Sequence, residues 1–142
     1  MTDREYLSQL KTIDGKIRYK CDEEQRWRDI ATNMTAKISE NKVQNTKNPD
    51  PLGEAITRAV TYQRECADLT IKLIELKHTI TDQIDSLNDD LAHYLLIAFF
   101  IDNKTYNDIS EEKDWTYNHT LKEIRKAILM FGDKYRELYK DL

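Results

Sequence analysis

The chain has little of what loop-rich and β-rich folds need. Its 142 residues include only 3 Gly and 2 Pro, and 34% of them are charged. Gly and Pro mark most turns, so their scarcity disfavours a fold of many short strands and favours long, solvent-covered helices. Because the mean hydropathy is −0.76, apolar residues must be gathered into stripes if the chain is to bury a core.

Long hydrophobic runs are also missing. The longest, Tyr94–Ile101, is far shorter than the ~20 residues that cross a bilayer. The N-terminus lacks the basic start, apolar stretch and small-residue cleavage site of a secretory signal. These absences predict a cytoplasmic protein with no membrane partner.

Patterns for metal binding and catalysis are absent from the sequence. The cysteines, Cys21 and Cys66, lie far apart, and His78, His93 and His119 are scattered. A zinc site needs about four convergent ligands, usually in close sequence pairs, so we expect reduced thiols packed in or beside helices and no metal. No Gly-rich phosphate loop is present, and no Ser or Cys has a His at a supportive spacing. We therefore expect no enzyme activity, no cofactor and no small-molecule substrate.

Positive charge, which a nucleic-acid-binding protein usually has in excess, is scarce. The net charge is −4; residues 1–88 hold 14 basic and 15 acidic side chains, and residues 89–142 hold 8 and 11. This global field opposes a polyanion. Any contact with DNA must therefore come from a local cationic face.

Two stretches carry apolar residues at alternating steps of three and four, which is the pattern of a coiled-coil seam. The first seam consists of Tyr6, Leu10, Ile13, Ile17, Lys20, Glu24, Trp27, Ala31, Met34 and Ile38, with Lys20 and Glu24 as polar exceptions. The second consists of Leu52, Ala55, Ala59, Tyr62, Cys66, Leu69, Leu73, Leu76, Ile80, Ile84, Leu87 and Leu91. Each helix would hold roughly 36 residues and extend about 54 Å.

Local signals mark where these two helices begin. Thr2 with Glu5 forms a capping-box pattern, and Asp50 followed by Pro51 is a typical helix start. Between the helices, residues 40–50 are rich in Asn and have no apolar face. The sequence therefore predicts an antiparallel two-helix coiled-coil hairpin over residues 1–88, with its loop at about 40–50.

Residues 89–142 predict a small three-helix domain. The stretch Leu91–Ile101 is apolar on more than one side, as expected of a buried helix, and Asn103 can take the left-handed turn that ends it. Thr105 with Asp108 caps a short helix that continues to about Lys113.

A longer helix follows, with Thr116 as its cap. Its expected inward face consists of Tyr117, Leu121, Ile124, Ile128 and Phe131. Gly132 either ends this helix or begins a bend into residues 135–142. The whole chain is thus predicted to be all-α, with the hairpin followed by a helix-turn-helix domain.

The helix-turn-helix arrangement gives the outward side of the last helix a function. In such motifs the short helix crosses the DNA backbone, and the next helix places its N-terminal turns in the major groove. The residues opposite the inward face are Asn118, His119, Lys122, Arg125 and Lys126. Asn pairs with adenine, Arg with guanine and Lys with phosphate. Lys104, Thr105 and Thr116 lie at helix starts, where free N–H groups favour phosphate. Periodicity alone fits the solvated face of an ordinary bundle equally well.

Four segments carry a resemblance to a known family, namely EYLSQLKTIDGKIRYKCDEEQRWRDIAT, VQNTKNPDP, LIELKHTITDQIDSL and FFIDNKTYNDISEEKDWTYNHTLKEIRKAI. Together they resemble small phage late transcriptional regulators of the ArpU/RinA type. The last resembles region four of sigma factors, with Ile109-Ser110, Trp115-Thr116 and Ala127-Ile128 at the family's recurrent pairs. Ser110 replaces the usual Ala, and Glu123 and Ile124 replace an apolar residue and a His.

The resemblance implies a DNA-binding regulator that acts on promoter DNA in the cytoplasm of a bacterial host. The hairpin would then contact host RNA polymerase or a second copy of the chain in a homodimer. An alternative is a protein-interaction module, an adaptor or inhibitor built on the hairpin, that does not bind specific DNA. A DNA-packaging component with the same motif is a third alternative.

Overall fold

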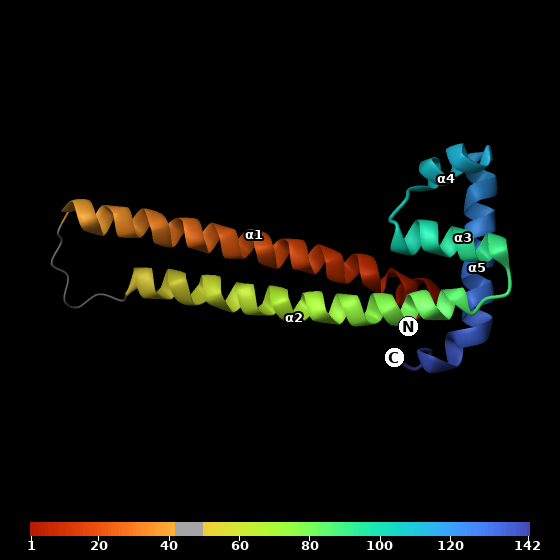
Figure 1. Ribbon diagram of the computed structural model, residues 1–142, viewed down its shortest axis with the longest axis horizontal. Coiled ribbons are helices and arrows are strands. Elements are labelled where there is room, and N and C mark those ends of the chain that lie inside the picture. Colours follow the sequence, from red (N-terminus) through yellow and green to blue (C-terminus); the bar gives the residue numbers. More distant parts are fainter. Residues whose placement is uncertain (42–49) are drawn as a thin grey trace. The chain divides into compact units, whose positions relative to one another are not determined.

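The computed structural model describes residues 1–41 and 50–142, and these residues form helices without any strand. The predicted all-α fold is therefore confirmed. In chain order the elements are α1 (Asp3–Asn41), α2 (Pro51–Asp85), α3 (Asp90–Leu96), the π-helix η1 (Ile97–Ile101), α4 (Tyr106–Lys113), α5 (Tyr117–Tyr135) and the 3-10 helix η2 (Arg136–Leu138). Figure 1 shows this order by colour.

The chain divides into two compact units. The hairpin unit comprises Asp14–Lys72, and the head unit comprises Met1–Ile13 together with Leu73–Leu142. Both α1 and α2 contribute to each unit, because each helix is continuous through the division. The predicted domains at 1–88 and 89–142 stay a prediction, but the packing groups the start of α1 and the end of α2 with the last three helices.

In the hairpin unit α1 and α2 run antiparallel, as the sequence predicts. Passing along α1, the contacts on α2 move steadily towards its start. The thiol of Cys66 donates to the carbonyl of Ile17 at 3.9 Å, and Lys20 forms a 2.5 Å ion pair with Glu65. The antiparallel order also brings the guanidinium of Arg58 within 4.9 Å of the centre of a Trp27 ring.

The predicted seam residues of this unit whose side chains are described are buried or half-buried. Lys20, a polar exception in the pattern, is accounted for by its pairing with Glu65, which raises the pKa of the lysine. Cys21 and Cys66 are free thiols, and the neighbouring Cys66 thiol is the main cause that raises the pKa of Cys21 to about 11.

The predicted helix starts are confirmed by their hydrogen bonds. The N–H of Glu5 donates to the hydroxyl of Thr2 at 3.1 Å, and the N–H of Thr2 donates to the Glu5 carboxylate at 3.2 Å. Asp50 accepts from the N–H of Gly53 at 2.9 Å. Of the predicted loop, residues 42–49 lie outside the described residues, as does the side chain of Ile38.

The head unit has one core, to which α1 to α5 and η1 contribute. Its buried residues are Leu7 and Leu10 of α1, Ile80 and Ile84 of α2, Ala92, Leu95, Leu96, Ala98, Phe99 and Phe100 of the α3–η1 segment, Ile109 of α4, Ile124, Ala127, Ile128 and Phe131 of α5, and Tyr139. In Figure 1 α5 runs past both α3 and α4. The last three helices are thus completed by the first turns of α1 and the last turns of α2.

Asp3 joins the two ends of the chain within the head unit. Its carboxylate accepts two hydrogen bonds from the Arg136 guanidinium, at 3.1 and 2.9 Å, and a third from the hydroxyl of Tyr139 at 2.8 Å. The Tyr139 ring is buried and stacks on Tyr6 with 4.2 Å between the ring centres. Hydrogen bonding to Arg136 lowers the pKa of Asp3 despite the opposing effect of burial.

Gly132 lies inside α5 and does not end it. The residue is buried, and a Cβ at this position would collide with the carboxylate of Asp3. The missing side chain lets the start of α1 approach α5 closely. Of the two alternatives that the sequence leaves open, a stop at Gly132 is excluded, and the helix continues to Tyr135 before the turn of η2.

We predict that Asp3→Asn lowers the free energy of unfolding by about 1–3 kcal/mol at pH 7, because a charge-assisted network loses its anion. The folded pKa of Asp3 lies below its ordinary value of 3.8. The carboxylate therefore contributes fully above about pH 4, and this contribution is lost as the pH falls through the lower folded value. Urea unfolding of the wild type and of Asp3→Asn, from pH 7 down into acid, measures this. The difference between their free energies of unfolding should shrink as the pH falls.

Asp133→Asn is the matched control, since Asp133 pairs with the same guanidinium at 3.3 Å but has a side chain that is 66% exposed. Exposed pairs add little stability, so this variant should unfold almost as the wild type does. Equal losses in the two variants would contradict the role given to Asp3.

Candidate nucleic-acid interface

The start of α4 is fixed by a tight connection from η1. Asn103 takes the predicted left-handed conformation, with φ of 57°, and the N–H of Lys104 donates back to the carbonyl of Ala98 at 2.9 Å. Thr105 and Asp108 then form the predicted capping box, with bonds of 2.9 and 3.1 Å. The backbone N–H of Thr105 lowers the pKa of Asp108. The N-terminal end of α4 is therefore rigidly defined.

The turn between α4 and α5 has the compactness that a helix-turn-helix motif requires. Only residues 114–116 separate the two helices. Asp114 supplies the left-handed conformation, with φ of 56°, that glycine often provides at such a turn. The N–H of Trp115 closes the turn on the carbonyl of Ser110 at 3.0 Å, and Thr116 caps α5 by accepting from the N–H of His119 at 3.2 Å.

The inward face of α5 differs from the predicted stripe at its first turn. Tyr117 was expected to lie inside but is 49% exposed, whereas Thr120 is fully buried. The hydroxyl of Thr120 lies 2.7 Å from that of Ser110 on α4, so a small polar side chain occupies the closest approach of the two helices. Tyr117 lies beyond that contact, and its ring packs edge-on against Tyr106 at 5.8 Å. Ile124, Ile128 and Phe131 are buried as predicted.

The outward face of α5 holds the five residues predicted to read DNA. Asn118, His119, Lys122, Arg125 and Lys126 are all exposed. Within residues 1–41 and 50–142, neither Lys122 nor Arg125 forms an ion pair, so both charges are available to an external anion.

Glu123 neutralises some of the positive charges on this face and leaves others without a partner among the described residues. Its carboxylate lies 3.4 Å from the ammonium of Lys126 and 4.0 Å from the ring nitrogen of His119. The His119 ring also meets Trp115 edge-on at 4.8 Å. Lys122 and Arg125 therefore carry most of the uncompensated positive charge of the outward face.

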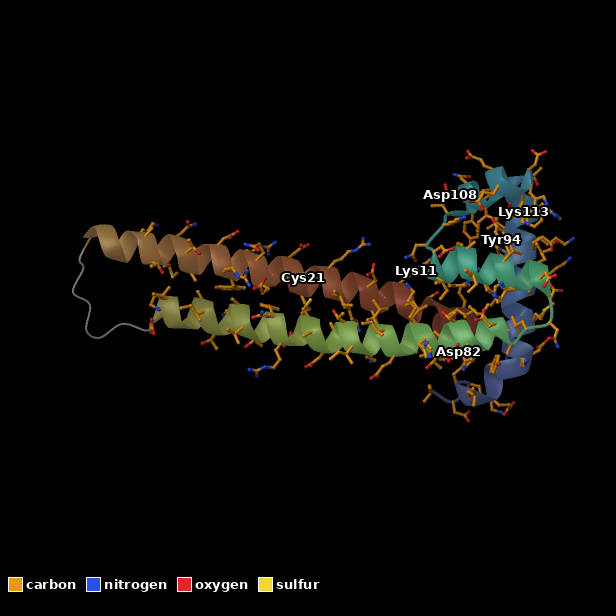
Figure 2. All side chains as sticks on the ribbon, viewed as in Figure 1. Lys11, Cys21, Asp82, Tyr94, Asp108 and Lys113 are labelled. Carbon is orange, nitrogen blue, oxygen red and sulfur yellow. The ribbon has the colours of Figure 1, made fainter. Side chains whose placement is uncertain are left out.

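Lys104, the other predicted cation, is engaged within the head unit. Its ammonium lies 2.7 Å from Glu112, which raises the pKa of the lysine and lowers that of the glutamate. The hydroxyl of Tyr94 donates to the same carboxylate, and Figure 2 shows Lys113 beside the Tyr94 ring, 4.3 Å from its centre. A phosphate would have to compete with Glu112 for Lys104.

The hydroxyls of Thr105 and Thr116 act as helix caps. Both residues are exposed, so they remain at the surface from which the sequence predicts phosphate contact.

Two exposed apolar residues extend the outward face and were not predicted. Leu129 is 56% exposed and Met130 is 39% exposed. Leu129 follows Arg125 by four positions, so a helical projection of the sequence would have placed it on this face. Met130 borders a cavity of ≈ 120 Å³ between α3 and α5, which Leu91 and Leu95 also line. These residues give the cationic face an apolar border.

In residues 1–41 and 50–142 no cluster of three or more His, Cys, Asp or Glu side chains could hold a metal ion. None of the helices there is both long enough and apolar enough to span a membrane.

No family model matches the chain, and no match is found among curated proteins or solved structures.

We predict that the left-handed turn at Asp114 determines the stability of the motif. Asp114→Ala should lower the free energy of unfolding by about 1 kcal/mol, because a Cβ without a local hydrogen-bonding group is strained at positive φ. Asp114→Gly should be at least as stable as the wild type. Thermal unfolding of the two variants shows which of them is more stable, and we expect it to be Asp114→Gly.

Asn107, an exposed residue within α4, is the control position. In an ordinary helical conformation Gly is less favourable than Ala by about 1 kcal/mol. At this position Asn107→Ala should therefore be more stable than Asn107→Gly. The same order at both positions would contradict the prediction.

Proposed function

We propose that this protein is a phage-encoded DNA-binding regulator of transcription that uses α4 and α5 as a helix-turn-helix. The observation that carries the proposal is the exposure of Lys122 and Arg125, unpaired within the described residues, on the helix that follows a three-residue turn. On the same face Lys126 pairs with Glu123, so Lys122 and Arg125 carry its free charge.

The geometry supports distinct roles for the outward residues. Arg125 can donate two hydrogen bonds to the O6 and N7 of a guanine, and Asn118 can pair with an adenine edge. Lys122 supplies a mobile charge for phosphate. The first turns of α4 and α5 also hold N–H groups that the caps at Thr105 and Thr116 do not use, and these can donate to the backbone of the duplex.

The acidic balance of the chain shapes how this binding would occur. A net charge of −4 repels a polyanion at long range, so affinity depends on the local contacts and is modest for the protein alone. Such a regulator gains from a partner on the same promoter. We propose host RNA polymerase as that partner, contacted by the hairpin in the bacterial cytoplasm, in keeping with the resemblance to ArpU/RinA-type late regulators.

We predict that Lys122→Ala and Arg125→Ala each weaken binding to a duplex selected by the wild-type protein from a random pool. The loss should be about 1–3 kcal/mol for a side chain that reads a base and less for one that contacts phosphate. A base-reading residue should also lose discrimination at one position of the selected site. Fluorescence anisotropy at fixed salt concentration measures both effects.

Lys16→Ala and Arg64→Ala are the matched controls, since both side chains are exposed in the hairpin unit and belong to no ion pair of the described residues. They should bind as the wild type does. If all four variants bind alike, α5 is not the reading helix and the proposal fails.

A protein-interaction module is the second candidate, and one observation favours it. Ile56, Val60 and Ile71 of α2 are exposed. Steps of four and eleven place them near one side of the helix, and exposed apolar side chains gathered on one side are typical of a surface that another protein covers.

Salt dependence separates the two candidates. A DNA-reading face releases counterions, so its affinity for the selected duplex should fall steeply between about 50 and 200 mM salt. An interaction module would yield no selected duplex and no such slope.

A further inference from the structure

A second group of cations lies beside the start of α4, and α1 contributes it. Arg4 donates from Nη1 to the hydroxyl of Tyr106, the first residue of α4, at 3.2 Å. About two turns further along α1, the ammonium of Lys11 lies 3.8 Å from the centre of the Phe99 ring. Figure 2 marks Lys11 on α1, near the end of the α3–η1 segment.

In the part of the chain that the structure describes, these two cations have no counter-ion. Among residues 1–41 and 50–142, neither Arg4 nor Lys11 belongs to an ion pair, whereas Lys104, Lys126 and Arg136 of the same unit all have carboxylate partners. The pKa of Lys11 is lowered first by burial and then by the positive charge of Arg4. The face of Phe99 stabilises the two charges, with Arg4 at 6.0 Å, but does not neutralise them.

The position of Arg4 relates it to both helices of the motif. Tyr106, which holds its guanidinium, also packs on Tyr117, the first residue of α5. One aromatic side chain therefore connects Arg4 to the starts of α4 and α5. In a helix-turn-helix complex the helix that corresponds to α4 crosses the DNA backbone, so its start is where phosphates come closest.

We infer that Arg4, assisted by Lys11, binds backbone phosphates of the same duplex whose bases α5 reads. This inference rests on the proposed DNA-binding function and extends its surface to α1. Tyr106 holds the guanidinium before DNA arrives, so less side-chain freedom is lost on binding. The phosphates supply the anions that these two cations lack among the described residues.

Arg4→Gln and Arg4→Lys test the inference in the full-length chain. Gln keeps a donor for Tyr106 but removes the charge, whereas Lys keeps the charge. The probe is a short duplex of mixed sequence, and its affinity is measured by anisotropy at several salt concentrations. Arg4→Gln should reduce the slope of log affinity against log salt by about 0.9, the value for one phosphate contact, and Arg4→Lys should restore most of it. Lys11→Gln should reduce the slope by the same amount or less.

The controls distinguish this inference from the proposed function. Arg64→Gln, at an exposed position of the hairpin unit, should leave the slope unchanged, and thermal unfolding should show that all variants are folded. If Lys122→Ala and Arg125→Ala weaken binding while Arg4→Gln matches the wild type, the role of Arg4 is refuted and the proposed function stands. If the wild type binds neither this duplex nor a selected one, both are refuted.

Discussion

The contact between the two ends of the chain is the constraint on which the head unit depends. Tyr139 is buried against Tyr6, and Asp3 satisfies both the hydroxyl of Tyr139 and the guanidinium of Arg136. A phenol and a carboxylate are costly to bury without partners, so these groups stabilise the structure only as a set. The absence of a side chain at Gly132 lets the set form. Through this contact, α3, α4 and α5 pack against the start of α1 and the end of α2 in one core.

This bracing matters for the candidate interface because a reading helix must be held in a fixed orientation. The capping box at Thr105 fixes the start of α4, and the buried hydroxyl pair of Ser110 and Thr120 fixes its contact with α5. Asp114 adopts a left-handed conformation, which allows a short turn between the two helices. These contacts lie at the ends of α4 and α5 and on their facing sides, and Lys122 and Arg125 on the outward side of α5 stay exposed.

The charges of the head unit are arranged locally, which reconciles an acidic chain with a cationic face. Carboxylates lie beside Lys104, Lys126 and Arg136, and they leave Lys122 and Arg125 without partners among the described residues. Screening limits the reach of the distant acids to about 8–10 Å at ordinary salt concentrations, so nearby groups decide what an approaching phosphate meets. The exposed apolar residues of α2 are a separate feature, and they suit a protein partner better than a duplex.

The sequence by itself determined the elements of this protein: two long helices, their seams, the caps at Thr2, Asp50, Thr105 and Thr116, and the exposed cations of α5. These features follow from spacing and from bonds between residues a few positions apart, which any window of the chain contains. Only the tertiary structure decided that the starts of α1 and α4 meet through Arg4 and Tyr106, that Thr120 replaces Tyr117 inside, and that α5 continues through Gly132. Those outcomes depend on contacts between residues far apart in the chain, where shape and burial outweigh local pattern.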